Sequence, residues 1–160
     1  MSYRVGIGYD IHRFIEGRPL VLGGVEIPYV LGLLGHSDGD VLLHAICDAL
    51  LGAVSAGDIG EHFSDTDPKY QGIPSVELLK AVYESMEEQG FLIENIDAIV
   101  IAKQPSLVPF KREMQRKIAA ALKIEETRVN IKAKTNNGMG DLGNGEAIAS
   151  YATVLVSKGE

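Results

Sequence analysis

The sequence predicts an α+β protein, a two-layer sandwich of about four main mixed strands with three helices on one face. Two observations favour this fold class. Segments with the two-residue apolar alternation of strands are interspersed with three longer segments that carry helix signals. The 160 residues are also enough for one ordinary core, and no linker, repeat or low-complexity tract divides them. We therefore expect a single layered domain over residues 1–160.

Short strands are expected before the first helix. In the strand at about 3–11, apolar residues alternate with smaller or polar ones. Shorter strands follow around 19–29, and they are broken at Gly23-Gly24. A long apolar helix is then predicted at about 38–56, where Ser37 or Asp38 can cap its start.

The middle of the chain alternates loops and helices. The polar segment 58–72 is expected to form a long loop, and a long loop in a compact domain is commonly functional. Pro74 suits the first turn of a helix that runs to about 89. Segment 91–103 is a strand pair or one long strand with a bend, and a third helix is predicted at about 109–123.

The C-terminal part predicts two strands around a glycine-rich loop, with strands at 128–135 and 146–157 and the loop at 136–145. The last strand is apolar on both faces, which favours a homo-oligomer in which a partner subunit covers the sheet. Its apolar residues are Ile148, Tyr151, Val154, Leu155 and Val156.

Composition excludes several classes of protein. The net charge of −7 predicts no binding to nucleic acid or to an anionic membrane surface. Cys47 is the only cysteine, so an intrachain disulfide and thiolate zinc sites are excluded. Apolar runs stay well short of the ~18 residues of a membrane span, and no signal region is evident. A cytoplasmic location is expected, with a plastid as the alternative if a transit peptide has been removed.

Two segments combine to suggest a metal site. Asp10 and His12 are two residues apart in a strand, so their side chains point to the same face. In the first helix, Asp40, His44 and Asp48 form one stripe. A solvent-exposed face would explain such a stripe, but this one lacks Lys, Arg and Glu.

Asp10, His12 and His44 together would supply one carboxylate and two imidazoles. Three protein ligands with an open fourth position are typical of catalytic zinc. Asp48, one turn after His44, is placed to orient an imidazole as a supporting carboxylate. The alternative is that either histidine is a core residue hydrogen-bonded to the backbone.

Two loops are candidates for ligand binding. Asp58, between Gly57 and Gly60, could accept hydrogen bonds from a hydroxylated ligand. The segment AKQPSLVP at 102–109 has two prolines and could recognise a base edge through its backbone, although an ordinary strand-to-helix turn explains it as well.

The chain resembles the family of 2-C-methyl-D-erythritol 2,4-cyclodiphosphate synthases, enzymes of the non-mevalonate route to isoprenoid precursors. The resemblance covers nearly the whole chain, in order and with compatible spacing. It rests on GYDIHRF, LGGVEIP, GLLGHSDGDVLLHAICDALLGAVSAGDIGEHFSDTDP, AKQPSLVP, VNIKAKT and GNGEAIA.

The resemblance implies a metal-dependent phosphorus–oxygen lyase. Such an enzyme converts 4-diphosphocytidyl-2-C-methyl-D-erythritol 2-phosphate to the 2,4-cyclodiphosphate and CMP, by intramolecular attack of the 2-phosphate on the β-phosphorus. It further implies a homotrimer with active sites between subunits, one Zn²⁺ per subunit, and Mg²⁺ or Mn²⁺ bound with the substrate.

The resemblance also assigns residues, beginning with Asp10, His12 and His44 as zinc ligands. The 2-phosphate and the erythritol would contact His36, Ser37, Asp58, Gly60, Phe63 and Asp65. The cytidine and the diphosphate would contact, from the neighbouring subunit, Ala102, Pro105, Ser106, Leu107, Ala133, Lys134 and Thr135.

Three positions depart from the family pattern. Asn137 stands where many members have a Glu that ligates the second metal, so weaker magnesium binding is expected. Ser106 stands where a Lys is common, and Lys103 or Lys134 could replace that charge. Asn144 replaces an Arg near the trimer axis, where isoprenoid diphosphates bind in the family, which puts that kind of regulation in question.

Two other functions fit the same residues. A zinc-dependent phosphoesterase would use water as the nucleophile in place of the internal phosphate. A non-catalytic trimer would bind cytidine nucleotides without turnover. The reaction products separate these functions, because only the synthase forms a cyclic diphosphate.

Overall fold

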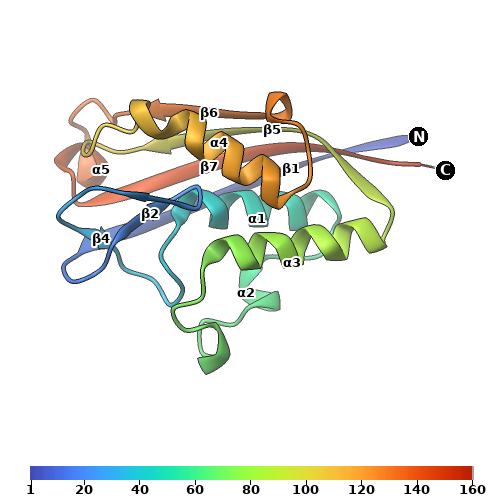
Figure 1. Cartoon of the computed structure of the whole chain (residues 1–160), viewed down its shortest axis with the longest axis horizontal. Helices are drawn as coiled ribbons and strands as arrows, with labels where there is room; N and C mark the ends of the chain where they lie inside the picture. Colours follow the sequence, from blue (N-terminus) through green and yellow to red (C-terminus); the bar gives the residue numbers. More distant parts are fainter. Residues whose placement is uncertain (160) are drawn as a thin grey trace.

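The computed structural model describes residues 1–159, which form a curved sheet with helices packed on one side (Figure 1). Within these residues the main sheet has five strands in the order β4-β1-β7-β5-β6. The strands are β1 (Ser2–Ile15), β4 (Gly32–Leu33), β5 (Phe91–Ile101), β6 (Val129–Lys134) and β7 (Ala147–Lys158). Only the pairing of β5 with β6 is parallel, so the sheet is mixed, as predicted.

A separate hairpin of β2 (Leu20–Leu22) and β3 (Val25–Ile27) turns at the two glycines that were predicted to break this segment. The remaining long elements are three helices, namely α1 (Val41–Ala53), α3 (Ser75–Glu88) and α4 (Lys111–Ala121). They lie on the same side of the sheet, which confirms the two-layer arrangement (Figure 1).

Helix α1 lies unusually close to β1, because glycines line the strand beneath it. A Cβ atom added at Gly6 would lie 1.8 Å from the carbonyl oxygen of Ala49, and one at Gly8 would lie 1.8 Å from that of Ala45. Only glycine permits so close an approach between two backbones. The helix axis is thereby held directly over the strand whose next residues are Tyr9 and Asp10.

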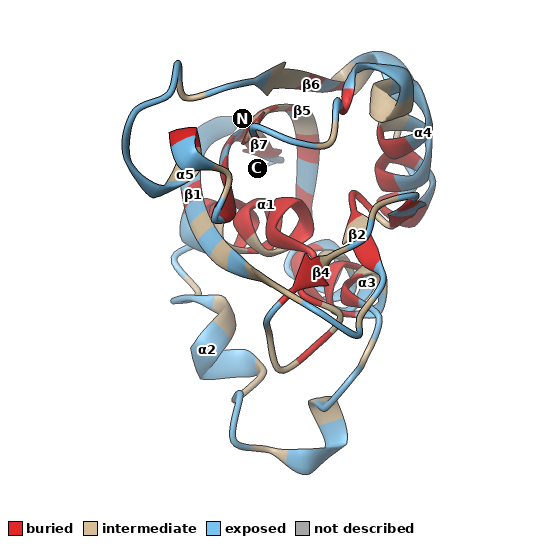
Figure 2. Ribbon diagram, turned by 90° about the vertical axis from the view of Figure 1, so that its left-hand side faces the viewer, coloured by how far each residue is buried: buried red, intermediate tan, exposed pale blue. Residues whose placement is uncertain are grey.

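The opposite face of the sheet is uncovered, and along β1 it is apolar. Five side chains of β1 on this face are between 42 % and 72 % exposed: Tyr3, Val5, Ile7, Tyr9 and Ile11. Figure 2 shows the resulting alternation of exposed and less exposed residues along β1. A contiguous apolar face of this kind is typical of a protein–protein interface.

Several predicted boundaries were wrong by a few residues. Strand β1 runs on to Ile15, and helix α1 starts at Val41 with Asp40 as its cap in place of Ser37 or Asp38. Segment 91–101 is one strand whose bend is a β-bulge between Ile93 and Asn95.

The predicted loops contain short helices. The loop at 58–72 includes α2 (Ile59–His62) and the 3₁₀ turn η1 (Pro68–Tyr70), and the glycine-rich loop includes α5 (Gly140–Asn144). Two more 3₁₀ turns, η2 (Val108–Phe110) and η3 (Glu126–Arg128), flank α4. Among residues 1–159, none of the helices combines the length and apolar character needed to cross a membrane.

Candidate metal centre

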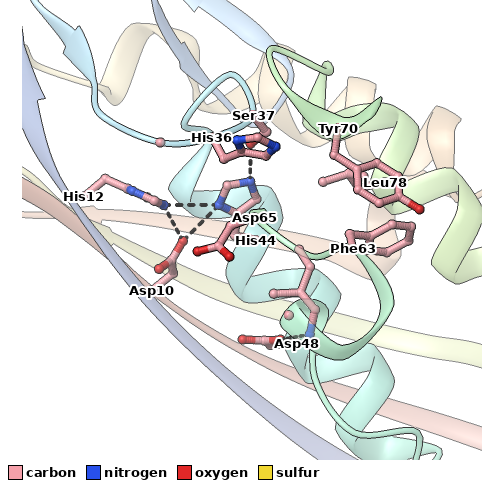
Figure 3. A pocket seen from close by; sticks show the side chains of 13 residues that line it. Asp10, His12, His36, Ser37, His44, Asp48, Phe63, Asp65, Tyr70 and Leu78 are labelled. Carbon is pink, nitrogen blue, oxygen red and sulfur yellow. Dashed lines mark hydrogen bonds and ion pairs between the residues drawn. The ribbon is translucent and has the colours of Figure 1, made fainter. Parts of the chain in front are cut away.

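The three predicted metal ligands converge where β1 emerges from beneath α1. Residues of β1 with even numbers face the helix, beginning with Gly6 and Gly8, so Asp10 and His12 continue the same face. His44 lies in the first turns of α1 and points back toward them (Figure 3). Two residues that share a strand face are thus joined by one from a helix, as the sequence predicted.

The donor atoms of these residues form a small triangle. The Oδ2 atom of Asp10 lies 2.8 Å from Nε2 of His12 and 3.0 Å from Nδ1 of His44. The two imidazole nitrogens are 3.2 Å apart. All three residues are half-buried, so the triangle is partly shielded from water while remaining accessible from one side.

Burial and hydrogen bonding shift the pKa values of Asp10 and His12 in opposite directions. Burial would raise the pKa of Asp10, but hydrogen bonds from His12 and His44 outweigh it and lower that pKa to about 2. Burial would lower the pKa of His12, but the Asp10 carboxylate and a hydrogen bond to the Leu34 backbone raise it. The centre therefore holds a negative charge that attracts a proton or a cation.

The donor set fits a zinc ion. Ligand atoms about 2.05 Å from a tetrahedral zinc lie about 3.3 Å apart, close to the spacing of the three atoms here. One carboxylate oxygen and two imidazole nitrogens are also ligands that zinc accepts, and three of them leave a fourth position open.

The second ring nitrogen of His44 meets a polar cluster that the sequence pattern did not predict. Its Nε2 atom lies 2.8 Å from Oγ of Ser75 and 2.9 Å from Oγ of Ser37. The Ser75 hydroxyl donates in turn to Oδ1 of Asp38, at 2.5 Å. The only sequence signal for Ser75 is its place after Pro74 at the start of a helix, which gives no hint of a partner 31 residues earlier.

The other members of the predicted stripe have different roles. Asp48 was expected to orient an imidazole, and the structure corrects this: its Oδ1 accepts the backbone N–H of Ile59 at 2.8 Å, while both ring nitrogens of His44 face other groups. Asp40 is fully buried and accepts backbone N–H groups from Gly23, Gly24 and Leu43. Burial raises its pKa to about 6 against these three hydrogen bonds.

The triangle opens into a cavity of about 400 Å³. Its lining includes most of the residues expected to hold substrate, namely His36, Ser37, Gly60, Phe63 and Asp65. Tyr70 and Leu78 complete its apolar side, opposite the histidines (Figure 3). The volume and the mixed lining suit a small polar ligand with an apolar portion.

Other predicted substrate residues lie outside this cavity. Asp58 caps α2 by accepting the N–H of Glu61, next to the cavity lining. The residues expected to hold cytidine and diphosphate lie at or just after the C-terminal ends of β5 and β6, where Ala102 donates its N–H to the Lys134 carbonyl at 2.9 Å. Within that group Ala102 and Leu107 are buried in the core, whereas Ser106, Lys134 and Thr135 are exposed. One chain therefore does not bring the two predicted sets together.

Fold and site together define a two-layer α+β protein with a candidate Asp-His-His metal centre at the wall of a cavity. The chain belongs to the YgbB family, whose model matches residues 3–157. It is 57% identical over 155 residues to the 2-C-methyl-D-erythritol 2,4-cyclodiphosphate synthase of Pelotomaculum thermopropionicum, covering 97% of this chain and 96% of that relative. The synthase of Bacillus subtilis is 48% identical over 157 residues, with 98% and 99% covered.

Comparison with solved structures supports the same family assignment. The chain is similar to IspF of Plasmodium falciparum in complex with CDP, with a TM-score of 0.86, 32% identity, and 99% of this chain and 98% of that chain covered. Similarity to the bifunctional IspDF of Campylobacter jejuni has a TM-score of 0.95 and 45% identity, and the match covers 99% of this chain but 43% of that longer one. The family resemblance inferred from the sequence is confirmed, and it is a family of enzymes.

Proposed function

We propose that the protein converts 4-diphosphocytidyl-2-C-methyl-D-erythritol 2-phosphate to 2-C-methyl-D-erythritol 2,4-cyclodiphosphate and CMP. The observation that carries this proposal is the triangle of Asp10, His12 and His44, which opens into the cavity. Relatives that share about half of the sequence or more are named for this activity.

Asp10, His12 and His44 would hold the zinc ion through one oxygen and two nitrogens. When bound, zinc would act as a Lewis acid that polarises a phosphate oxygen and offsets its charge. Next to it, His36 and Ser37 would hold the 2-phosphate from the cavity wall. On the other side of the cavity, Gly60, Phe63 and Asp65, with neighbouring Asp58, would hold the erythritol.

The reaction itself needs positioning more than a protein nucleophile. A 2-phosphate oxygen forms a bond to the β-phosphorus, and the bond from that phosphorus to the oxygen bridging the α-phosphorus breaks. That bridging oxygen keeps the electron pair and leaves as part of CMP. Because nucleophile and electrophile belong to one molecule, holding its two ends together supplies much of the rate enhancement.

The second half of the site would come from a neighbouring subunit of a homotrimer. The uncovered apolar face of β1 supports an assembly in which the sheets pack together. Such packing would let the residues at the C-terminal ends of β5 and β6 of one chain reach the cavity of another. They would bind cytidine and diphosphate there, with Mg²⁺ or Mn²⁺ bound along with the diphosphate.

The test is ³¹P NMR of the reaction of the purified protein with this substrate, Zn²⁺ and Mg²⁺. We expect a cyclic diphosphate together with CMP, and the loss of both in the His44→Ala variant. CMP with an open-chain product would support a zinc phosphoesterase instead. Binding of CMP or CDP without turnover would support a non-catalytic nucleotide-binding trimer.

A further inference from the structure

We propose that Ser75 and Asp38 are positioning residues that fix the ring of His44 through a relay of hydrogen bonds. The inference rests on the proposed metal-binding role of His44. It concerns what holds this ligand in place, a task that the sequence pattern had suggested for Asp48.

The order of donors in the relay follows from the chemistry of its members. A carboxylate oxygen accepts hydrogen bonds, so the Ser75 hydroxyl donates its one proton to Oδ1 of Asp38. The Ser75 oxygen is then left to accept, and its nearest donor is Nε2 of His44 at 2.8 Å, with the Ser37 hydroxyl at 3.2 Å. Nε2 therefore carries a proton, and in the metal-bound protein Nδ1, which faces Asp10 and His12, would offer its lone pair to the metal in place of its hydrogen bond to Asp10.

The relay is anchored on both sides. The Ser75 side chain is completely buried, so its hydroxyl has no water to turn to. Asp38 accepts the backbone N–H of Ser75 at 2.9 Å through Oδ2 and the N–H of Asp40 at 3.0 Å through Oδ1. Pro74 precedes the helix and has no polar side chain, so the Asp38 carboxylate supplies the cap of α3 as well as the acceptor for the hydroxyl.

The two serines next to His44 therefore have different roles. Ser37 also lies within reach of His44, at 2.9 Å, but it lines the cavity. Because Ser75 already accepts from Nε2, the hydroxyl of Ser37 can turn to a ligand without releasing the ring. Ser75, held by Asp38, thus orients the metal ligand His44, while Ser37 remains available to bind a ligand in the cavity.

The test measures the affinity of the metal-free protein for Zn²⁺ alone by competition with a chromogenic chelator. Ser75→Ala removes the hydroxyl but keeps the backbone N–H that Asp38 accepts, so the cap of α3 survives. Ser37 stays 2.9 Å from Nε2 in this variant, but it lines the cavity and is not held by Asp38 as Ser75 is, so we expect the zinc dissociation constant to rise by about 10- to 100-fold. The visible spectrum of bound Co²⁺ should change as well, because the orientation of one ligand is no longer fixed.

Ser157→Ala is the matched control. Ser157 is also a buried serine that donates to a carboxylate, that of Glu94 at 2.5 Å, but it lies at the far end of the sheet. This variant should bind zinc as the parent does. The double variant Asp38→Ala/Ser75→Ala should lose no more zinc affinity than the worse single variant, because either substitution alone already breaks the chain of hydrogen bonds to His44.

Two outcomes would overturn the relay. One is parental zinc affinity and an unchanged Co²⁺ spectrum in Ser75→Ala. The other is strictly additive losses of affinity in the double variant. If instead the parent itself binds zinc no better than His44→Ala, the metal centre and with it the proposed function fail, which is a separate result.

Discussion

The Oδ2 atom of Asp10 lies 3.0 Å from the Nδ1 atom of His44, although 34 positions separate the two residues in the chain. This contact depends on how closely α1 approaches β1 over Gly6 and Gly8. The metal centre is therefore a direct consequence of backbone packing two to four residues before Asp10 in the strand.

Gly8→Ala tests this dependence. The added Cβ would lie 1.8 Å from the carbonyl oxygen of Ala45, so α1 must move away from β1. We expect the free energy of unfolding to fall by about 1–3 kcal/mol or more, and the zinc affinity of any folded protein to fall with it. Gly52→Ala is the control, because this exposed position of α1 has free space around it and alanine should stabilise the helix by about 0.5–1 kcal/mol. A Gly8→Ala protein with normal stability and zinc affinity would disprove the argument.

Asp40→Asn should separate stability from metal binding. Asp40 accepts three backbone N–H groups with its two oxygens, and an amide would turn a donor toward at least one of them. We expect a loss of about 1–3 kcal/mol in urea unfolding with zinc affinity of the folded protein preserved. Loss of zinc affinity at full stability would instead place Asp40 in the metal centre.

The stability of the metal-free protein should depend on His12. Its pKa is raised in the folded state by Asp10, so the bound proton stabilises the fold below the unfolded-state pKa of about 6.5. That stabilisation is lost as pH rises through the raised pKa. Zinc binds the neutral ring, so its own stabilising effect should grow over the same range.

Urea unfolding in the presence of a chelator, from about pH 6 to about pH 9, measures this effect. Comparison with His12→Gln removes the contribution of all other groups, and the parent should lose more stability than the variant as pH rises. Equal pH slopes for the two proteins would contradict the prediction.

Ile7→Lys tests the apolar face. Ile7 is 72 % exposed in the single chain, and burial of a lysine between sheets would cost several kcal/mol per subunit. We expect the mass in solution to fall from that of the proposed trimer to that of a monomer, and turnover to fall with it. Val30→Lys is the control, because Val30 is 81 % exposed but lies outside the β-strands. A trimeric Ile7→Lys protein would show that this face is not the interface.

Asn137→Glu tests the expected weak binding of the second metal. Asn137 is exposed and adopts a left-handed conformation with φ of 52°, which asparagine tolerates better than glutamate. The substitution should therefore lower stability slightly, by about 1 kcal/mol, and reduce the Mg²⁺ concentration required for half-maximal turnover. An unchanged magnesium dependence would mean that this position does not contact the metal.

Local patterns were enough to predict the elements and half of the metal centre. Apolar periodicity located the long strands and the three helices, because the faces of strands and helices repeat every 2 and 3.6 residues whatever they pack against. For the same reason the two-residue spacing of Asp10 and His12 was enough to place both side chains on one face of the strand. The apolar character of the last strand also indicated an uncovered sheet.

The stripe of Asp40, His44 and Asp48 shows what such patterns cannot predict, namely which partner each side chain meets. The three residues share one helix face, yet Asp40 meets the amides of Gly23 and Gly24, His44 meets Asp10, and Asp48 meets Ile59. Each partner comes from a different segment, so helical spacing could not assign the three roles.

By itself, then, the sequence determined which segments form strands and helices, which family the chain resembles, and which residues could serve as zinc ligands. Tertiary structure decided which polar side chains meet: the closing of the metal triangle, the burial of Asp40, and the link from Asp38 through Ser75 to His44. The physical reason is the separation along the sequence between the residues that interact. Periodicity is set by bonds between neighbouring residues, whereas a hydrogen bond across 31 or 37 positions exists only after the layers have packed.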